Sequence, residues 1–187
     1  MQRAAIDGGT FVAVVGPSGA GKDAVIGYAR SRLGGDPRFH FVRRVITRPC
    51  DGQSEIHDTM DVAQFHAAEA AGHFALTWRA HGLLYGLPAT VDALIAAGRT
   101  VVANTSRGAI DALRGRYRRV EVAEITAPPQ ILAARIAARG REGGDDVRRR
   151  LASRPAAGGR VIDNSGPLEE AGEQMLGLLR ATLPPAT

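Results

Sequence analysis

The sequence of 187 residues contains one cysteine, few aromatic residues and no long hydrophobic run. Cys50 alone excludes an intrachain disulfide, and the five histidines lack the spacing of metal ligands. Aromatic residues make up 5% of the chain, a thin supply for the stacking platforms that bind single-stranded nucleic acid. The apolar run at residues 11–15 is too short for a signal peptide, and none approaches the roughly 18 residues of a membrane span. We expect a cytoplasmic protein without nucleic-acid or membrane partners.

Lysine is also nearly absent, because Lys22 is the only one and arginine supplies the rest of the positive charge. The net charge of +5 suits nucleic acid, an anionic membrane surface or a phosphorylated small substrate, and charge alone does not choose among them. The single lysine falls in a glycine-rich segment, where a compact ammonium group on a flexible stem can reach phosphate oxygens. This position indicates a functional phosphate-binding loop.

The order of the predicted elements indicates one α/β domain that spans residues 1–187. Apolar and β-branched runs predict strands at residues 10–15, 39–46, 74–86, 101–104, 120–126 and 161–162. Helical spacing and turn residues predict helices at residues 22–33, 61–71, 88–97, 108–114, 128–139 and 168–183. Alternating strands and helices predict a parallel sheet with helices on both faces.

A glycine-rich loop follows the first predicted strand and precedes the first predicted helix, which is the context that a phosphate-binding loop requires. Its glycines let consecutive backbone N–H groups turn toward an anion, and the dipole of the following helix favours negative charge. Lys22 can reach the β- and γ-phosphates, where negative charge accumulates during phosphoryl transfer. We therefore predict a three-layer P-loop kinase fold that binds ATP through nine residues: Gly16, Pro17, Ser18, Gly19, Ala20, Gly21, Lys22, Asp23 and Ala24.

Asp23 occupies the position where the general phosphate-loop pattern has serine or threonine, whose hydroxyl binds magnesium. One interpretation is a decayed loop, because a carboxylate repels a triphosphate unless a cation lies between them. The other is that Asp23 binds Mg²⁺ directly or through water, since this hard cation prefers oxygen ligands. We favour Mg²⁺ as a cofactor beside ATP, with Asp23 as its protein ligand.

Four segments resemble the guanylate-kinase-like family: the loop at residues 16–22, Ile46-Thr47-Arg48-Pro49, Tyr85-Gly86, and residues 135–140. The resemblance runs from about residue 10 to residue 179. It implies a core at residues 8–42, 88–138 and 155–183, an acceptor-binding region at 43–87, and an arginine-bearing lid at 139–154. Within that lid, Arg139 and Arg150 would close on the donor and transition-state phosphates.

Three residues depart from the guanylate kinases, which bind GMP through polar side chains. Asp51 stands where a second phosphate-binding arginine follows Arg48. Leu76 replaces the glutamate that binds guanine, and Leu84 replaces a tyrosine. A leucine leaves the donors of a purine edge unpaired, at a cost of about 1–3 kcal/mol each. Guanine is therefore not the expected acceptor base.

Six segments are similar to a second family of the same superfamily, the ribose 1,5-bisphosphate phosphokinases of phosphonate utilisation. These segments are residues 21–23, 47–49, 74–78, 81–86, 101–107 and 139–142, and Asp23 belongs to that pattern. The resemblance implies phosphoryl transfer from ATP to ribose 1,5-bisphosphate, which gives 5-phosphoribosyl 1-diphosphate (PRPP) and ADP. The attacking phosphate oxygen is already anionic near neutral pH, so we expect no general base, and catalysis consists of alignment and charge stabilisation.

Positive charge must bring the two anionic substrates together in such a reaction, and arginines can supply it. We predict catalytic roles for Lys22, Arg48, Arg139 and Arg150, with Arg48 binding an acceptor phosphate bidentately. Arg107 follows a predicted core strand, at the edge where ligands of open parallel sheets gather. The predicted acceptor-binding residues are Arg48, Tyr85, Asn104, Ser106 and Arg107.

Alternatives stay open for several residues and for the function. Trp78 and Tyr85 either border the sugar or belong to the core, and His81 either contacts the acceptor or lies in an exposed loop. Three carboxylates either orient arginines or sugar hydroxyls or are surface charge: Glu55, Asp58 and Asp61. The other functions are a nucleoside monophosphate kinase, a kinase-like interaction module without turnover, and a nucleic-acid-binding protein. The oligomeric state is also open, with a homodimer among the options.

Overall fold

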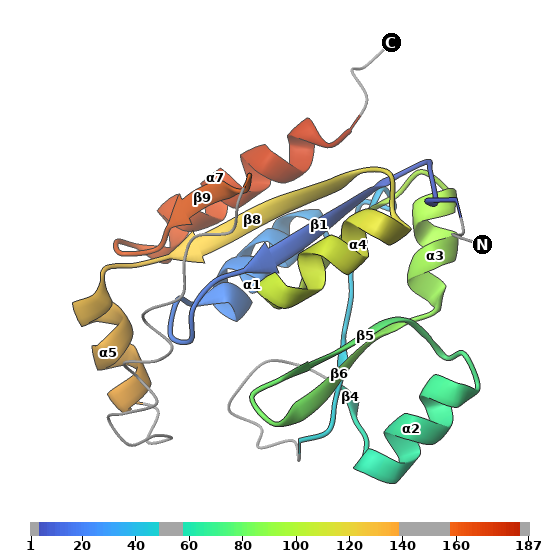
Figure 1. Ribbon diagram of the computed structural model, residues 1–187. Helices are drawn as coiled ribbons and strands as arrows, with labels where there is room; N and C mark the ends of the chain where they lie inside the picture. Colours follow the sequence, from blue (N-terminus) through green and yellow to red (C-terminus); the bar gives the residue numbers. More distant parts are fainter. Residues whose placement is uncertain (1–3, 49–57, 139–157, 184–187) are drawn as a thin grey trace.

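Five parallel strands form the central sheet of the protein, and the computed structural model describes residues 4–48, 58–138 and 158–183. The strand order is β2-β7-β1-β8-β9, and each adjacent pair is parallel. The bounds are Thr10–Val15 for β1, Phe39–Phe41 for β2, Thr100–Asn104 for β7, Val120–Thr126 for β8 and Arg160–Asp163 for β9. The strand that leads into the phosphate loop is therefore the middle strand (Figure 1).

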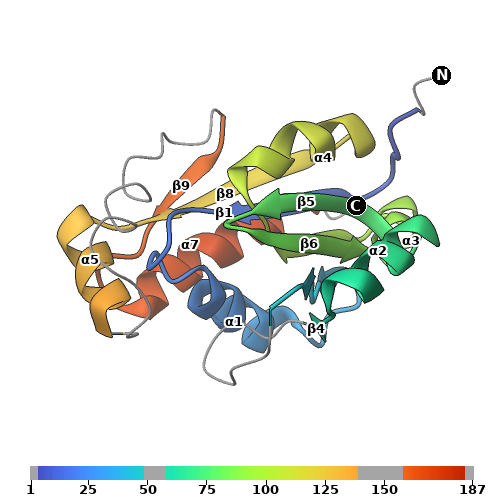
Figure 2. The same ribbon diagram turned by 60° about the horizontal axis from the view of Figure 1, so that its bottom comes forward.

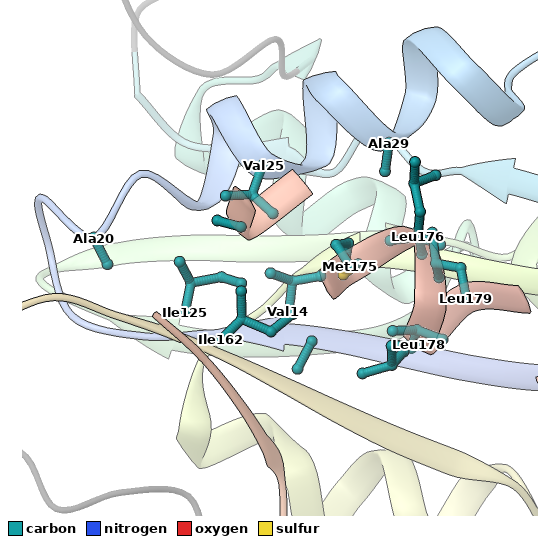
Figure 3. Close-up of a cluster of buried hydrophobic side chains, with 14 of the residues drawn as sticks. Val14, Ala20, Val25, Ala29, Ile125, Ile162, Met175, Leu176, Leu178 and Leu179 are labelled. Carbon is teal, nitrogen blue, oxygen red and sulfur yellow. The ribbon is translucent and has the colours of Figure 1, made fainter. Parts of the chain in front are cut away.

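Helices cover both faces of this sheet, as predicted. On one face, Val12 and Val14 of β1 belong to a core cluster with α1 (Lys22–Leu33) and α7 (Leu168–Ala181), drawn in Figure 3. On the other face, Phe11, Ala13 and Val15 of β1 join a second cluster with α3 (Thr90–Ala96) and α4 (Ile110–Arg116). Because both faces of β1 are buried, its sequence is a continuous apolar run rather than an alternating one. The three-layer α/β fold is confirmed.

A second, four-stranded sheet lies outside the central one, in the order β4-β3-β6-β5. Its strands are β3 (Val45–Ile46), β4 (Asp58–Thr59), β5 (Phe74–Ala80) and β6 (Leu83–Pro88). The β5–β6 hairpin packs on the central domain because Ala75 and Leu87 belong to the same core cluster as α3 and α4 (Figure 2). The expected acceptor-binding range, residues 43–87, covers these strands, and its role stays a prediction.

Two expectations about element bounds are wrong. Residues 39–46 do not form one strand, because β2 pairs with β7 in the central sheet whereas β3 pairs with β4 and β6 in the second sheet. The chain crosses between the sheets at residues 42–44, so Phe39 packs in a core cluster of the central sheet and Val45 in a separate cluster of the second sheet. Pro88 does not open a helix either: it ends β6, where it pairs with Phe74, and α3 begins at Thr90.

Local signals place the remaining elements. Asp61 caps α2 (Val62–Ala70), since its side chain accepts from the backbone N–H of Gln64 at 2.7 Å in a capping box. A 3₁₀ turn (Arg107–Ala109) precedes α4, and α5 (Pro129–Ala138) follows β8. Among the described helices, none combines the length and apolar character needed to cross a bilayer.

Candidate active site

The phosphate loop joins β1 to α1 at the carboxyl edge of the central sheet. Gly21 is the residue before α1 and has a φ of 85°, a left-handed conformation that glycine adopts without strain. An alanine methyl at Gly21 would collide with Nδ2 of Asn164 and lie 3.9 Å from Nη1 of Arg135. The loop is therefore enclosed by the segment after β9 and by α5, and its backbone conformation depends on glycine.

Lys22 folds back onto the loop that carries it. Its Nζ donates to the carbonyl oxygens of Gly16 at 2.9 Å and Pro17 at 3.0 Å. The ammonium group is thus held at the mouth of the loop, among the residues predicted to surround the donor phosphates. A flexible stem allows Nζ to exchange these carbonyls for phosphate oxygens without movement of the backbone.

Asp23 meets Asn104 across the carboxyl edge of the sheet. Nδ2 of Asn104 donates to Oδ1 of Asp23 at 2.7 Å, and Asn104 is 5% exposed. The strand register explains the contact: Asn104 is the last residue of β7 and pairs with Val14, next to the start of the phosphate loop. Two residues predicted separately, one for the metal and one for the acceptor, therefore lie together.

Arg107 is paired with a buried carboxylate that the sequence analysis missed. Its Nη2 lies 2.6 Å from Oε1 of Glu124, which is 3% exposed on β8. Since β7 and β8 flank β1, this ion pair spans the end of the phosphate-loop strand. A glutamate inside an apolar strand was a usable signal, because a buried charge requires a partner. Arg107 lies at the expected edge, held by Glu124.

Two further residues near the loop were also missed. Asn164 is 4% exposed and its Nδ2 donates to the backbone oxygen of Ala20 at 2.7 Å, which fixes the loop from the β9 side. Arg135 projects from α5 toward Gly21, and no partner in the described part of the chain accepts from its buried Nη1. Asn164 directly follows β9, and Asn104 is the last residue of β7. A polar residue at the end of a predicted strand was therefore the signal that could have identified Asn164.

Aromatic and basic side chains of the second sheet form the other half of the site. Trp78 and Tyr85 stack with their ring centroids 5.4 Å apart and their planes at 8°. The guanidinium carbon of Arg44 lies 5.0 Å from the centroid of the Tyr85 ring, and Nη1 of Arg44 donates to the backbone oxygen of Asn104 at 3.0 Å. Arg44 was missed, because nothing in the sequence distinguishes it from the adjacent Arg43.

The other predicted residues of the acceptor side lie in separate places. Arg48 is half-buried just after β3, and its backbone oxygen accepts from Oγ1 of Thr59 at 3.1 Å. Ser106 precedes the 3₁₀ turn that carries Arg107. His81 is exposed in the tight turn of the β5–β6 hairpin, in agreement with the loop interpretation. Asp58 pairs with Arg43 at 2.8 Å, and both side chains are more than half exposed.

Some predicted residues lie outside the described ranges. Arg139, Arg150 and the proposed lid belong to residues 139–157, and Asp51 and Glu55 belong to residues 49–57.

The Asp23 carboxylate stands beside the phosphate loop, where its Oδ1 accepts from Nδ2 of Asn104. Among residues 4–48, 58–138 and 158–183, no group of three or more histidine, cysteine or acidic side chains could hold a metal by itself. This donor set fits Mg²⁺, which usually takes one or two carboxylates and completes its shell with substrate phosphates and water. It does not fit a resident metal held by protein ligands alone.

The fold and the phosphate loop define a P-loop kinase, and solved structures agree. The chain is similar to a guanylate kinase from Anaplasma phagocytophilum, with a TM-score of 0.68, 16% identity and coverage of 97% of this chain and 89% of that one. A gluconokinase from Sinorhizobium meliloti 1021 superposes with a TM-score of 0.54 at 18% identity and covers 95% of each chain. At these identities the similarity shows the fold. No family model matches the chain.

Curated proteins are similar over nearly the whole chain. The ribose 1,5-bisphosphate phosphokinase PhnN of Chelativorans sp. is 53% identical over 178 residues, which cover 92% of this chain and 85% of the relative. That of Agrobacterium fabrum is 46% identical and that of Methylobacterium radiotolerans 49%, covering 91% and 92% of this chain and 96% and 98% of the relatives. The chain belongs to the ribose 1,5-bisphosphate phosphokinase family.

Proposed function

We propose that this protein transfers the γ-phosphoryl group of ATP to ribose 1,5-bisphosphate and forms PRPP and ADP. The observation that carries the proposal is the junction at the carboxyl edge of the sheet. There the phosphate loop with Lys22 contacts, through Asp23 and Asn104, the sheet that carries Arg44 and Tyr85. The phosphate loop suits a nucleoside triphosphate, and the side with Arg44 and Tyr85 suits a second anion. Membership of the family supplies the identity of the acceptor.

The reaction requires alignment rather than proton transfer. An oxygen of the C1 phosphate forms a bond to the γ-phosphorus, the bond from that phosphorus to the β–γ bridging oxygen breaks, and ADP leaves. The attacking oxygen is already anionic near neutral pH, so no residue needs to remove a proton. The protein must therefore overcome mutual repulsion between two polyanions and hold them in line.

The donor side is built by residues of the phosphate loop, and we propose the following roles. Backbone N–H groups of Gly16 and of residues 18–24 bind the phosphates, and Nζ of Lys22 leaves the carbonyls of Gly16 and Pro17 to contact the β- and γ-phosphates. Asp23 would hold Mg²⁺, which neutralises phosphate charge when bound. Asn104 keeps the Asp23 carboxylate turned toward the site through its 2.7 Å hydrogen bond.

The acceptor side comes from residues 43–87 and from the end of β7. We propose that Arg48 and Arg107 contribute positive charge to acceptor binding, with Glu124 fixing the orientation of Arg107. Tyr85 forms an aromatic wall, since it is 7% exposed and stacked on Trp78. Asn104 and Ser106 offer polar groups at the edge where the two substrates meet. We further propose a cytoplasmic site of action, where ATP and Mg²⁺ are available.

Mass analysis of the products formed from ATP, Mg²⁺ and ribose 1,5-bisphosphate tests the function. We expect the acceptor to gain one phosphoryl group with equimolar ADP, and GMP to serve poorly under the same conditions. Lys22→Met should lower kcat/KM for ATP at least about 100-fold, because it removes a charge aimed at the transferring group. Arg38→Met, which removes an exposed cation paired with Asp36, is the control and should stay near wild type. Preferential phosphorylation of GMP would refute the assignment.

A further inference from the structure

Arg44 is the basic residue that joins the two halves of the site. It immediately precedes β3 and is half-buried. One side of its guanidinium lies over the Tyr85 ring, with 5.0 Å from Cζ to the ring centroid. Its Nη1 donates to the backbone oxygen of Asn104 at 3.0 Å, so the group is fixed against both the second sheet and the end of β7. A guanidinium held in this way has a defined orientation before any ligand binds.

We propose that Arg44 binds the C1 phosphate of ribose 1,5-bisphosphate, the group that attacks ATP. This inference rests on the proposed function and names the residue that holds the reacting end of the acceptor.

The contacts of Asn104 place Arg44 at the reacting end. The backbone oxygen of Asn104 accepts from Arg44, and its side chain donates to Asp23, the residue directly after Lys22. A single residue therefore separates Arg44 from the loop that binds the donor phosphates. The attacking oxygen must approach the γ-phosphorus to about 3–3.5 Å, so the acceptor phosphate that reacts must lie at this junction.

The chemistry of a stacked guanidinium suits a phosphate. A guanidinium has five N–H groups in one plane, so Arg44 can keep its contact with the carbonyl of Asn104 while two N–H groups bind a phosphate side by side. The Tyr85 ring lies next to the guanidinium and shields it from water on that side, which strengthens its interaction with an anion. Lysine provides neither the plane nor the stacking.

The two nearby arginines differ from Arg44 in their surroundings. Arg43 pairs with Asp58 at 2.8 Å, and its side chain is 54% exposed, so it faces solvent rather than the junction. Arg48 follows β3, and its backbone oxygen accepts from Oγ1 of Thr59, whereas Arg44 precedes that strand and reaches Asn104 of β7. Arg43 is therefore a matched control, since it has the same side chain at the adjacent position.

Steady-state kinetics of Arg44→Gln and Arg43→Gln test the proposal. We expect Arg44→Gln to raise the KM for ribose 1,5-bisphosphate at least about 20-fold while the KM for ATP changes less than about twofold, as loss of one charged contact predicts. Arg44→Lys should recover only part of this loss. Arg43→Gln should leave both KM values within about twofold of wild type. Urea unfolding of each variant separates loss of binding from loss of folding.

Ribose 5-phosphate, which lacks the C1 phosphate, identifies the group that Arg44 binds. Its inhibition constant against ribose 1,5-bisphosphate should be the same for Arg44→Gln and wild type. An equal loss for both ligands would move the contact to the 5-phosphate and overturn the assignment. An active Arg44→Gln enzyme whose KM for ribose 1,5-bisphosphate equals that of wild type would also overturn the assignment. The same holds if its KM values for ribose 1,5-bisphosphate and for ATP rise in parallel. If the wild-type protein itself did not phosphorylate ribose 1,5-bisphosphate, the proposed function would fail, and with it the assignment.

Discussion

Replacement of Gly19 by alanine tests how the phosphate loop is held. Gly19 has a φ of 80° and packs directly on α5. An alanine methyl there would lie 3.0 Å from the backbone oxygen of Leu132 and 3.0 Å from Cγ1 of Ile136. Carbon atoms in good contact are about 3.5–4.0 Å apart, so either the loop or the helix must move by several tenths of an ångström. Leu132 and Ile136 are 4% and 5% exposed, which leaves the helix little room to yield.

The expected cost has two parts. A left-handed φ costs a residue with a side chain about 1–2 kcal/mol, and overpacking a well-filled contact costs about 1–3 kcal/mol. Since part of the strain relaxes through the loop, we expect Gly19→Ala to lower the free energy of unfolding by about 2–4 kcal/mol. The same relaxation moves the loop N–H groups off the phosphates, so kcat/KM for ATP should fall at least about tenfold.

Urea unfolding followed by circular dichroism measures the stability, and ADP release measures the activity. Gly27→Ala is the control: Gly27 lies within α1, and no heavy atom would come within 4 Å of the added methyl. That change should raise the free energy of unfolding by about 0.5–1 kcal/mol, because alanine favours a helix. The two glycine replacements should therefore change the free energy of unfolding in opposite directions. A stability change below about 0.5 kcal/mol for Gly19→Ala, with wild-type activity, would refute the packing argument.

Two further perturbations follow from other contacts. Asp23→Ala should raise the Mg²⁺ concentration for half-maximal activity about tenfold or more, as loss of a metal contact does, and an unchanged requirement would contradict a metal role. Tyr117→Phe should lower the free energy of unfolding by about 1 kcal/mol without loss of activity, because the Tyr117 hydroxyl donates to Oδ1 of Asp92 at 2.8 Å. Burial, then this hydrogen bond, raises the pKa of Tyr117 above its usual 10.0. The tyrosine therefore stabilises the fold below pH 10 and loses this contribution as pH rises further, so the difference between the two proteins should shrink above pH 10. A constant difference from pH 7 to pH 11 would rule this coupling out.

Features with a local cause could be predicted from the order of residues alone. The phosphate loop could be predicted because its glycine conformations and the following helix depend on residues close together in the chain. The cap of α2 is equally local, since Asp61 and Gln64 are three residues apart and bond to each other's backbone. The apolar run of β1 indicated a strand buried on both faces, and the alternation of elements predicted the layers. The family resemblance could also be seen in the sequence, because each of its motifs consists of a few consecutive residues.

Which distant residues lie together at the site depends on how the whole chain packs. Asp23 meets Asn104, and Arg107 meets Glu124, because β7 and β8 both flank β1 in a particular register. The crossing at residues 42–44 decided that Arg44 faces the junction whereas Arg43 faces solvent, a difference that two adjacent identical residues cannot reveal in a sequence. Strand order and register result from packing summed over the whole core. No short segment contains that sum, so the loop could be identified from the sequence, whereas the residues that surround it required the folded chain.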